Sequence, residues 1–95
     1  MRPVVIGDVR YRGRIFHFKE RLELCPAYDE TGELLCLEYE PMGIHVFAET
    51  RKKLMSELAE QICVLWDEYA CEDDANLTRA AIQLKKNLLG AIEET

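Results

Sequence analysis

Apolar residues recur every three or four positions through residues 50–70, the spacing of one face of an α-helix. The stripe consists of Leu54, Leu58, Ile62, Leu65 and Tyr69, widened on one side by Met55, Ala59 and Trp66. Thr50 is a suitable N-cap for the first free amides, so the pattern predicts a helix over Thr50–Ala70. A face this broad needs a sheet to cover it.

The preceding residues read as short β-prone segments separated by turns. Residues 3–6 and 9–11, a turn at residues 12–13 and a return through residues 15–18 predict an N-terminal hairpin. Phe16, Phe18, Leu22 and Leu24 share one face of an extended run, and we expect a break or bulge near residues 19–20.

A second hairpin is predicted around Asp29-Glu30-Thr31-Gly32, because Asp can bond its own backbone and Gly accepts a positive φ. With a symmetric four-residue turn, Leu22 faces Tyr39 and Leu24 faces Leu37 on the core side. Cys25 then faces Cys36 on the other side, which makes these two a candidate cross-strand thiol pair. They are either two half-buried thiols that suit a sheet or a redox-sensitive pair, and the second interpretation requires a low thiol pKa.

A third strand is expected at residues 44–48, with two alternatives for its core face. Pairing Tyr39 with Ile44 turns Ile44, Val46 and Ala48 inward, whereas a one-residue bulge turns His45 and Phe47 inward; we favour the first.

Beyond the acidic segment 72–76, Thr78 is the expected N-cap of a second helix that runs to about Ile92. Its apolar stripe is Leu77, Ala81, Leu84, Leu88 and Ile92. The chain is thus predicted to be a single α+β domain over residues 1–95. We expect an antiparallel β-meander of three to five strands, a long amphipathic helix packed on one face and a second C-terminal helix.

The net charge of −6 is unevenly distributed, with six basic and two acidic residues in positions 1–21 and an acidic remainder. An acidic body disfavours nucleic acid and suits a small basic protein as partner. The longest apolar run, residues 62–66, is too short to span a membrane, and the N-terminus lacks a signal-peptide pattern. We therefore expect a soluble, cytoplasmic protein.

The sequence has no motif typical of a particular reaction, a cofactor site or a metal site. The four cysteines lack zinc-ligand spacing, and no nucleophile or orienting carboxylate can be placed beside His17 or His45, so a non-enzymatic protein is expected. Arg51, Lys52 and Lys53 are unusual, because cations in the first turn oppose the helix dipole. They form a candidate partner surface, the alternative being solvated surface charge.

The middle of the chain resembles the N-terminal domain of HicB-type antitoxins, a partial RNase H-like fold with three meandering strands and a helix packed on them. The likeness covers about half the chain and rests on Leu22-Glu23-Leu24, Asp29-Glu30-Thr31-Gly32, residues 34–39, Pro41, Gly43 and Ala48-Glu49-Thr50. The family usually has Gly at the place of Ala48 and an acidic start to the helix, and residues 72–95 leave room for one helix rather than a DNA-binding module. The resemblance implies an antitoxin-like protein-binding domain without catalytic residues. The alternative is a self-associating domain whose second helix completes a homodimer.

Overall fold

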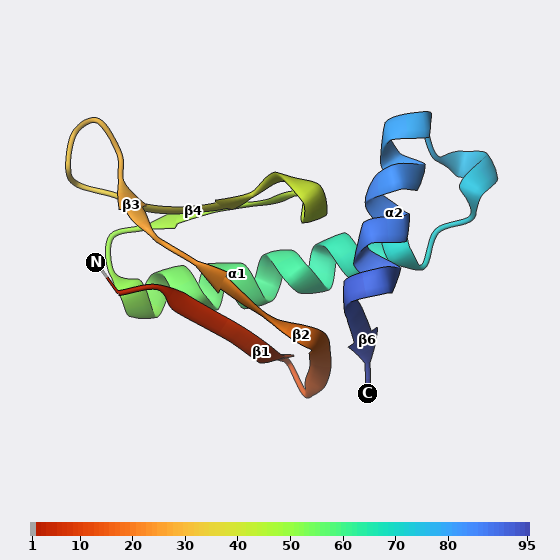
Figure 1. Cartoon of the computed structure of the whole chain (residues 1–95), viewed down its shortest axis with the longest axis horizontal. Helices are drawn as coiled ribbons and strands as arrows, with labels where there is room; N and C mark the ends of the chain where they lie inside the picture. The colour runs from red at the N-terminus through yellow and green to blue at the C-terminus, as the bar shows by residue number, and fades with distance from the viewer. Residues whose placement is uncertain (1) are drawn as a thin grey trace.

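The computed structural model describes residues 2–95, and within them six strands form two antiparallel sheets. One sheet has the order β1-β2-β6, from Val4–Tyr11, Arg14–Leu24 and Ile92–Glu94, and the other the order β3-β4-β5, from Ala27–Tyr28, Leu35–Tyr39 and Ile44–Ala48. Helix α1 spans Arg51–Leu65, continues as a π-helical turn η2 (Trp66–Ala70), and is followed by α2 (Arg79–Ala91) (Figure 1). Two short 3-10 turns complete the structure, η1 (Glu40–Met42) and η3 (Asp74–Asn76). The predicted α+β fold is confirmed.

The N-terminal hairpin is present, and its turn has positive φ at Arg12 (49°) and Gly13 (78°). Ile6 pairs with Leu22, but Asp8 pairs with His17, so residues 18–21 of β2 lie opposite Gly7 alone. This is the irregularity expected near residues 19–20, and it redirects the long strand β2 toward the second sheet.

The predicted register of the second hairpin is wrong by two residues. Cys36 lies opposite Ala27 rather than Cys25, and Leu22 and Leu24 pair with β1 instead of β4. The cause is the side chain of Asp29, whose Oδ1 accepts from the backbone N–H groups of residues 33 and 34, each at 3.2 Å. These bonds draw two further residues into the turn, which is closed by the Asp29 N–H donating to the residue 34 carbonyl at 2.8 Å.

Strand β5 has the inward face that we favoured. Tyr39 pairs with Ile44, and Ile44, Val46 and Ala48 are buried. The alternation of an antiparallel strand therefore leaves His45 and Phe47 on the outer face, where both are exposed.

Helix α1 packs against β5, β4 and β1, so it joins the two sheets in one core (Figure 1). Leu54, Leu58 and Ile62 are at most 1% exposed, which confirms the predicted stripe. Thr50 caps the helix as expected, its Oγ1 accepting from the Lys53 N–H at 3.2 Å. Within residues 2–95, every helix is too short or too polar to traverse a lipid bilayer.

The second helix begins after the predicted cap, Thr78, whose Oγ1 accepts from the Ala81 N–H at 3.1 Å. It ends one residue earlier than expected, because Ile92 leaves the helix and pairs with Phe18 as the start of β6. Strand β6 was not predicted. Its formation buries Ile92 (1% exposed) beside Leu88, the buried residue of α2.

The burial of α1 predicts different effects for two truncations on the same helix. Leu58→Ala should lower the free energy of unfolding by about 2–5 kcal/mol, since it leaves a cavity in the core. Val64→Ala, at a side chain that is 43% exposed, should change it by no more than about 0.5 kcal/mol. Urea unfolding of both variants measures the difference, and equal losses would contradict this orientation of α1.

Candidate functional site

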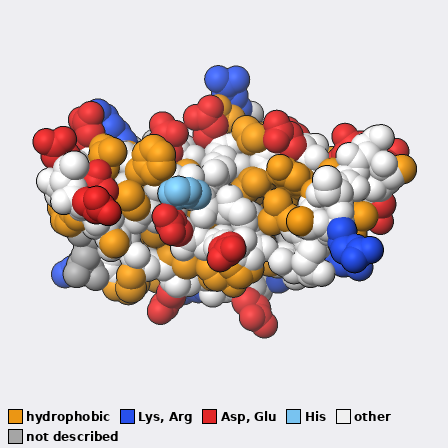
Figure 2. All heavy atoms as spheres, turned by 90° about the horizontal axis from the view of Figure 1, so that it is seen from above, with side chains coloured by type: hydrophobic (Ala, Val, Ile, Leu, Met, Phe, Trp, Pro, Cys, Tyr) orange, Lys and Arg blue, Asp and Glu red, His pale blue; other side chains and the backbone are white. Residues whose placement is uncertain are grey.

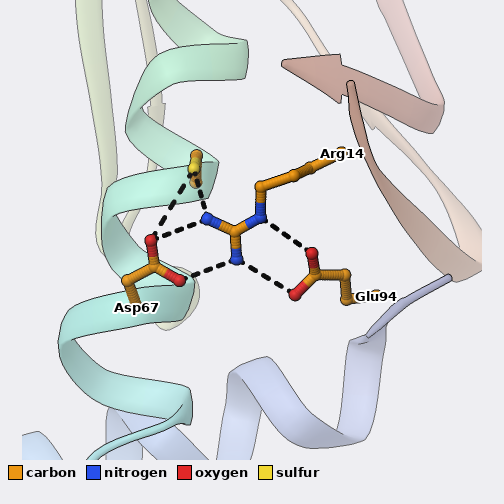
Figure 3. Close-up of polar contacts among 4 residues, drawn as sticks. Arg14, Asp67 and Glu94 are labelled. Carbon is orange, nitrogen blue, oxygen red and sulfur yellow. Dashed lines mark hydrogen bonds and ion pairs between the residues drawn. The ribbon is translucent and has the colours of Figure 1, made fainter. Parts of the chain in front are cut away.

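Arg14 lies at the centre of a polar cluster where the start of β2, the turn η2 that follows α1, and β6 meet (Figure 3). Its Nη1 and Nη2 donate to the two carboxylate oxygens of Asp67 at 2.8 and 2.7 Å. Its Nε and Nη2 donate to those of Glu94 at 2.7 and 3.0 Å. The guanidinium thus forms two bidentate ion pairs at once, a geometry that a lysine could not reproduce.

The charges of this cluster hold one another in their ionised forms. The hydrogen bonds that Arg14 donates lower the pKa of Asp67 and of Glu94. The same bonds, first to Asp67 and then to Glu94, raise the pKa of Arg14. Burial raises the pKa of the neighbouring Cys63 thiol, an effect that the Arg14 cation only partly opposes. Cys63 is therefore a buried thiol that accepts a hydrogen bond from Arg14 Nη1 at 3.2 Å, rather than an activated thiolate.

This cluster connects distant parts of the chain. Arg14 is 53 positions from Asp67 and 80 from Glu94, so no local spacing in the sequence indicates it. The guanidinium also lies over the ring of Phe16, with 5.1 Å to the centroid, and that ring is fully buried. We interpret the cluster as the anchor of the C-terminal segment.

The three cations of the first turn of α1 are all exposed, but they differ in their contacts. Arg51 donates to the backbone carbonyls of Arg2 and Pro3 at 2.8 and 2.9 Å, and so holds the chain ahead of β1. Lys53 lies 3.8 Å from the carboxylate of Glu49. Arg51 therefore has a contact within the fold that accounts for its position, while a role of all three in partner binding stays a prediction.

The two candidate cysteines are not cross-strand partners, although both line one shallow hollow beside β3 and β4. Cys25 is exposed and Cys36 half-buried, and both are free thiols. A redox role for the pair stays a prediction without the direct pairing on which it was based.

The two histidines each pair with one carboxylate across a strand pair. His17 Nδ1 lies 2.6 Å from Asp8, and His45 Nε2 lies 3.0 Å from Glu38. In residues 2–95 no three His, Cys, Asp or Glu side chains come together as a potential metal site.

A second candidate site lies between β5 and α1, and we call it the β5–α1 groove. It is a hollow of about 360 Å³ lined by His45, Val46, Phe47, Glu57, Glu60, Gln61 and Val64. A neighbouring hollow shares Phe47 and Glu57 and extends toward Leu34, Glu49 and Lys53, and we include both hollows in the β5–α1 groove. Phe47 and Val64 are 53% and 43% exposed, which is high for large apolar side chains.

Acidic residues border this apolar surface. The two hollows contain Glu49, Glu57 and Glu60 but a single lysine, Lys53, which already lies beside Glu49. In Figure 2, which looks down on the β3-β4-β5 sheet, acidic side chains surround hydrophobic ones, and Lys and Arg lie mostly toward the margins. The groove thus combines apolar contact area with negative charge.

Part of this groove could be inferred from the sequence. The strand alternation that places Ile44 and Val46 inward requires an outward Phe47. Val64 lies off the apolar stripe of α1, so its spacing indicates an apolar side chain on the exposed side of the helix. The approach of Glu57 and Glu60 to β5 depends on how α1 crosses the sheet, which local spacing does not determine.

The Arg14 cluster predicts a pH-dependent contribution to stability. Arg14→Gln should lower the free energy of unfolding at neutral pH, because Asp67 and Glu94 lose their common partner. The folded-state pKa of each acid is lowered, so the contribution is present above the ordinary values of 3.8 and 4.5 and is lost as pH falls through the folded values. Urea unfolding across a pH series should show wild type and variant converging in acid. Arg10→Gln, at an exposed position on β1, is the matched control, and a difference that persisted unchanged to low pH would contradict the assignment.

The Arg51 side chain donates two hydrogen bonds, whereas within residues 2–95 the Lys52 side chain makes no hydrogen bond or ion pair, so the same substitution should have opposite effects at the two positions. Lys52→Glu should raise the free energy of unfolding by about 0.3–1 kcal/mol, since an acid suits the helix N-terminus. Arg51→Glu should lower it and speed amide exchange at the start of β1, because a carboxylate replaces the donor to two carbonyl oxygens. Equal stabilisation by both substitutions would show that Arg51 has no role in holding β1.

Searches against protein-family models, curated proteins and solved structures found no match for this chain. The likeness to HicB-type N-terminal domains therefore rests on the sequence features given above. The function has to be inferred from the contacts and charges of the chain itself.

Proposed function

We propose that the protein is a small non-enzymatic binding domain, antitoxin-like in type, which holds a basic protein partner at the β5–α1 groove. The observation that carries this proposal is the pair of exposed apolar side chains, Phe47 and Val64, bordered by Glu57 and Glu60. Apolar anchors within a charged rim are typical of protein interfaces.

The sign of the charge supports a basic partner. Glu57 and Glu60 lie on one face of α1, three positions apart, and attract a positively charged surface at long range while Phe47 supplies contact area. The acidic balance of residues 22–95 acts in the same direction. Self-association through this groove is disfavoured, because it would bring the same carboxylates of two copies together.

A charge reversal tests the proposal. Glu57→Lys with Glu60→Lys should weaken retention of a basic protein from host lysate at least about tenfold, since attraction becomes repulsion. The matched control is Glu20→Lys with Glu23→Lys, two exposed acids three positions apart on β2, in the other sheet, that line neither hollow of the groove. Each retained protein is identified by mass spectrometry and its binding measured again with purified components at two salt concentrations. Failure to retain any basic protein in a manner that depends on Glu57 and Glu60 would overturn the proposal.

A further inference from the structure

Strand β5 is the outer strand of its sheet, with β4 as its one ladder partner within residues 2–95. The side chain of Gln61 covers part of its free edge. The His45 N–H donates to Gln61 Oε1 at 2.8 Å, and Gln61 Nε2 donates to the His45 carbonyl at 3.1 Å. The backbone groups of His45 therefore point away from β4 and toward α1.

The direction in which the backbone groups of His45 point determines the direction of the backbone groups of Phe47. Backbone groups of an antiparallel strand point alternately toward and away from a given neighbour, so residues two apart point the same way. The N–H and C=O of Phe47 thus also point away from β4, into the groove. No side chain of residues 2–95 hydrogen-bonds to them in the way that Gln61 bonds to His45. The edge remains open at Phe47.

The walls of the groove suit an extended chain beside this open position. Glu57, Glu60 and Val64 lie at helical spacing along the side of α1 that faces β5, while the Phe47 side chain lies on the outer face of the sheet. A strand added to β5 would place alternate side chains toward α1 and toward the outer face.

We propose that the β5–α1 groove binds an extended segment of a partner protein as an additional strand on β5, with basic side chains toward Glu57 and Glu60 and apolar ones beside Phe47. This inference rests on the proposed function and specifies its mode of binding. The main-chain hydrogen bonds at Phe47 would supply affinity, and the alternation of charge and apolarity would supply selectivity.

Gln61 has a defined part in this mode of binding. Its amide occupies the backbone groups of His45 in the manner of a neighbouring strand, so an incoming segment that extends past Phe47 must displace it. Gln61→Ala removes this competitor and should tighten binding several-fold. Weaker binding by Gln61→Ala would show that Gln61 contacts the partner, and would contradict its role as a competitor.

The experiment uses a blocked synthetic peptide that alternates lysine and valine, and a second peptide of identical sequence in which every second backbone amide is methylated. Methylation removes the donors of one strand edge but keeps the charge and the apolar side chains. The unmodified peptide should bind in fluorescence anisotropy and slow the exchange of the Phe47 amide, and the methylated peptide should bind at least about tenfold more weakly. Glu57→Lys with Glu60→Lys should abolish binding, and Glu20→Lys with Glu23→Lys, on the other sheet, should not.

Other outcomes overturn the inference. Equal binding of both peptides would show that the groove binds the basic peptide through its side chains and not as an additional strand on β5. No binding at millimolar peptide would remove the basic segment as occupant, and a doubled mass of Gln61→Ala in light scattering without peptide would identify a second copy as the occupant. Retention of a basic protein that depends on Glu57 and Glu60 would leave the proposed function standing in the first two cases, so the two proposals can fail separately.

Discussion

The two sheets depend on the burial of the apolar stripe of α1, because within residues 2–95 no backbone ladder runs from one sheet to the other. Leu54, Leu58 and Ile62 belong to one core cluster that includes buried side chains of both sheets. Each fully buried aliphatic side chain stabilises by about 1.5–3 kcal/mol, so three at this central position outweigh any single polar contact at the surface. The Arg14 cluster then holds η2, the continuation of α1, to β2 and β6.

The parts of the fold that were predicted are those encoded by neighbours in sequence. The period of α1, the caps at Thr50 and Thr78, and the inward face of β5 follow from local spacing and hydrogen-bonding chemistry. The register of β3 and β4 was missed because a single side chain, Asp29, lengthens the turn by two residues. Strand β6 was missed because its pairing partner lies more than seventy positions away in β2.

In the candidate sites, too, features set by residues close in sequence could be predicted and features set by tertiary packing could not. Arg51 breaks a local rule of helix charge, yet its two hydrogen bonds to the segment before β1 give the break a reason within the fold. The violated preference thus coincides with a tertiary contact at Arg51, and partner binding by the three cations stays a prediction. Phe47 could be placed outward from strand alternation alone, but the acidic wall beside it came from the packing of α1, and the Arg14 cluster had no signal in the sequence.

The long separation between β2 and β6 has a consequence for how the chain matures. As the polypeptide emerges from the ribosome, β1 and β2 can pair early, since their contacts are local. The other edge of β2 stays uncovered until Ile92–Glu94 have been synthesised, and closing so long a loop costs chain entropy that its contacts must offset. During that interval the nascent chain displays an unpaired strand that carries Phe16 and Phe18, which is the kind of surface that chaperones bind and that other unfinished chains can join.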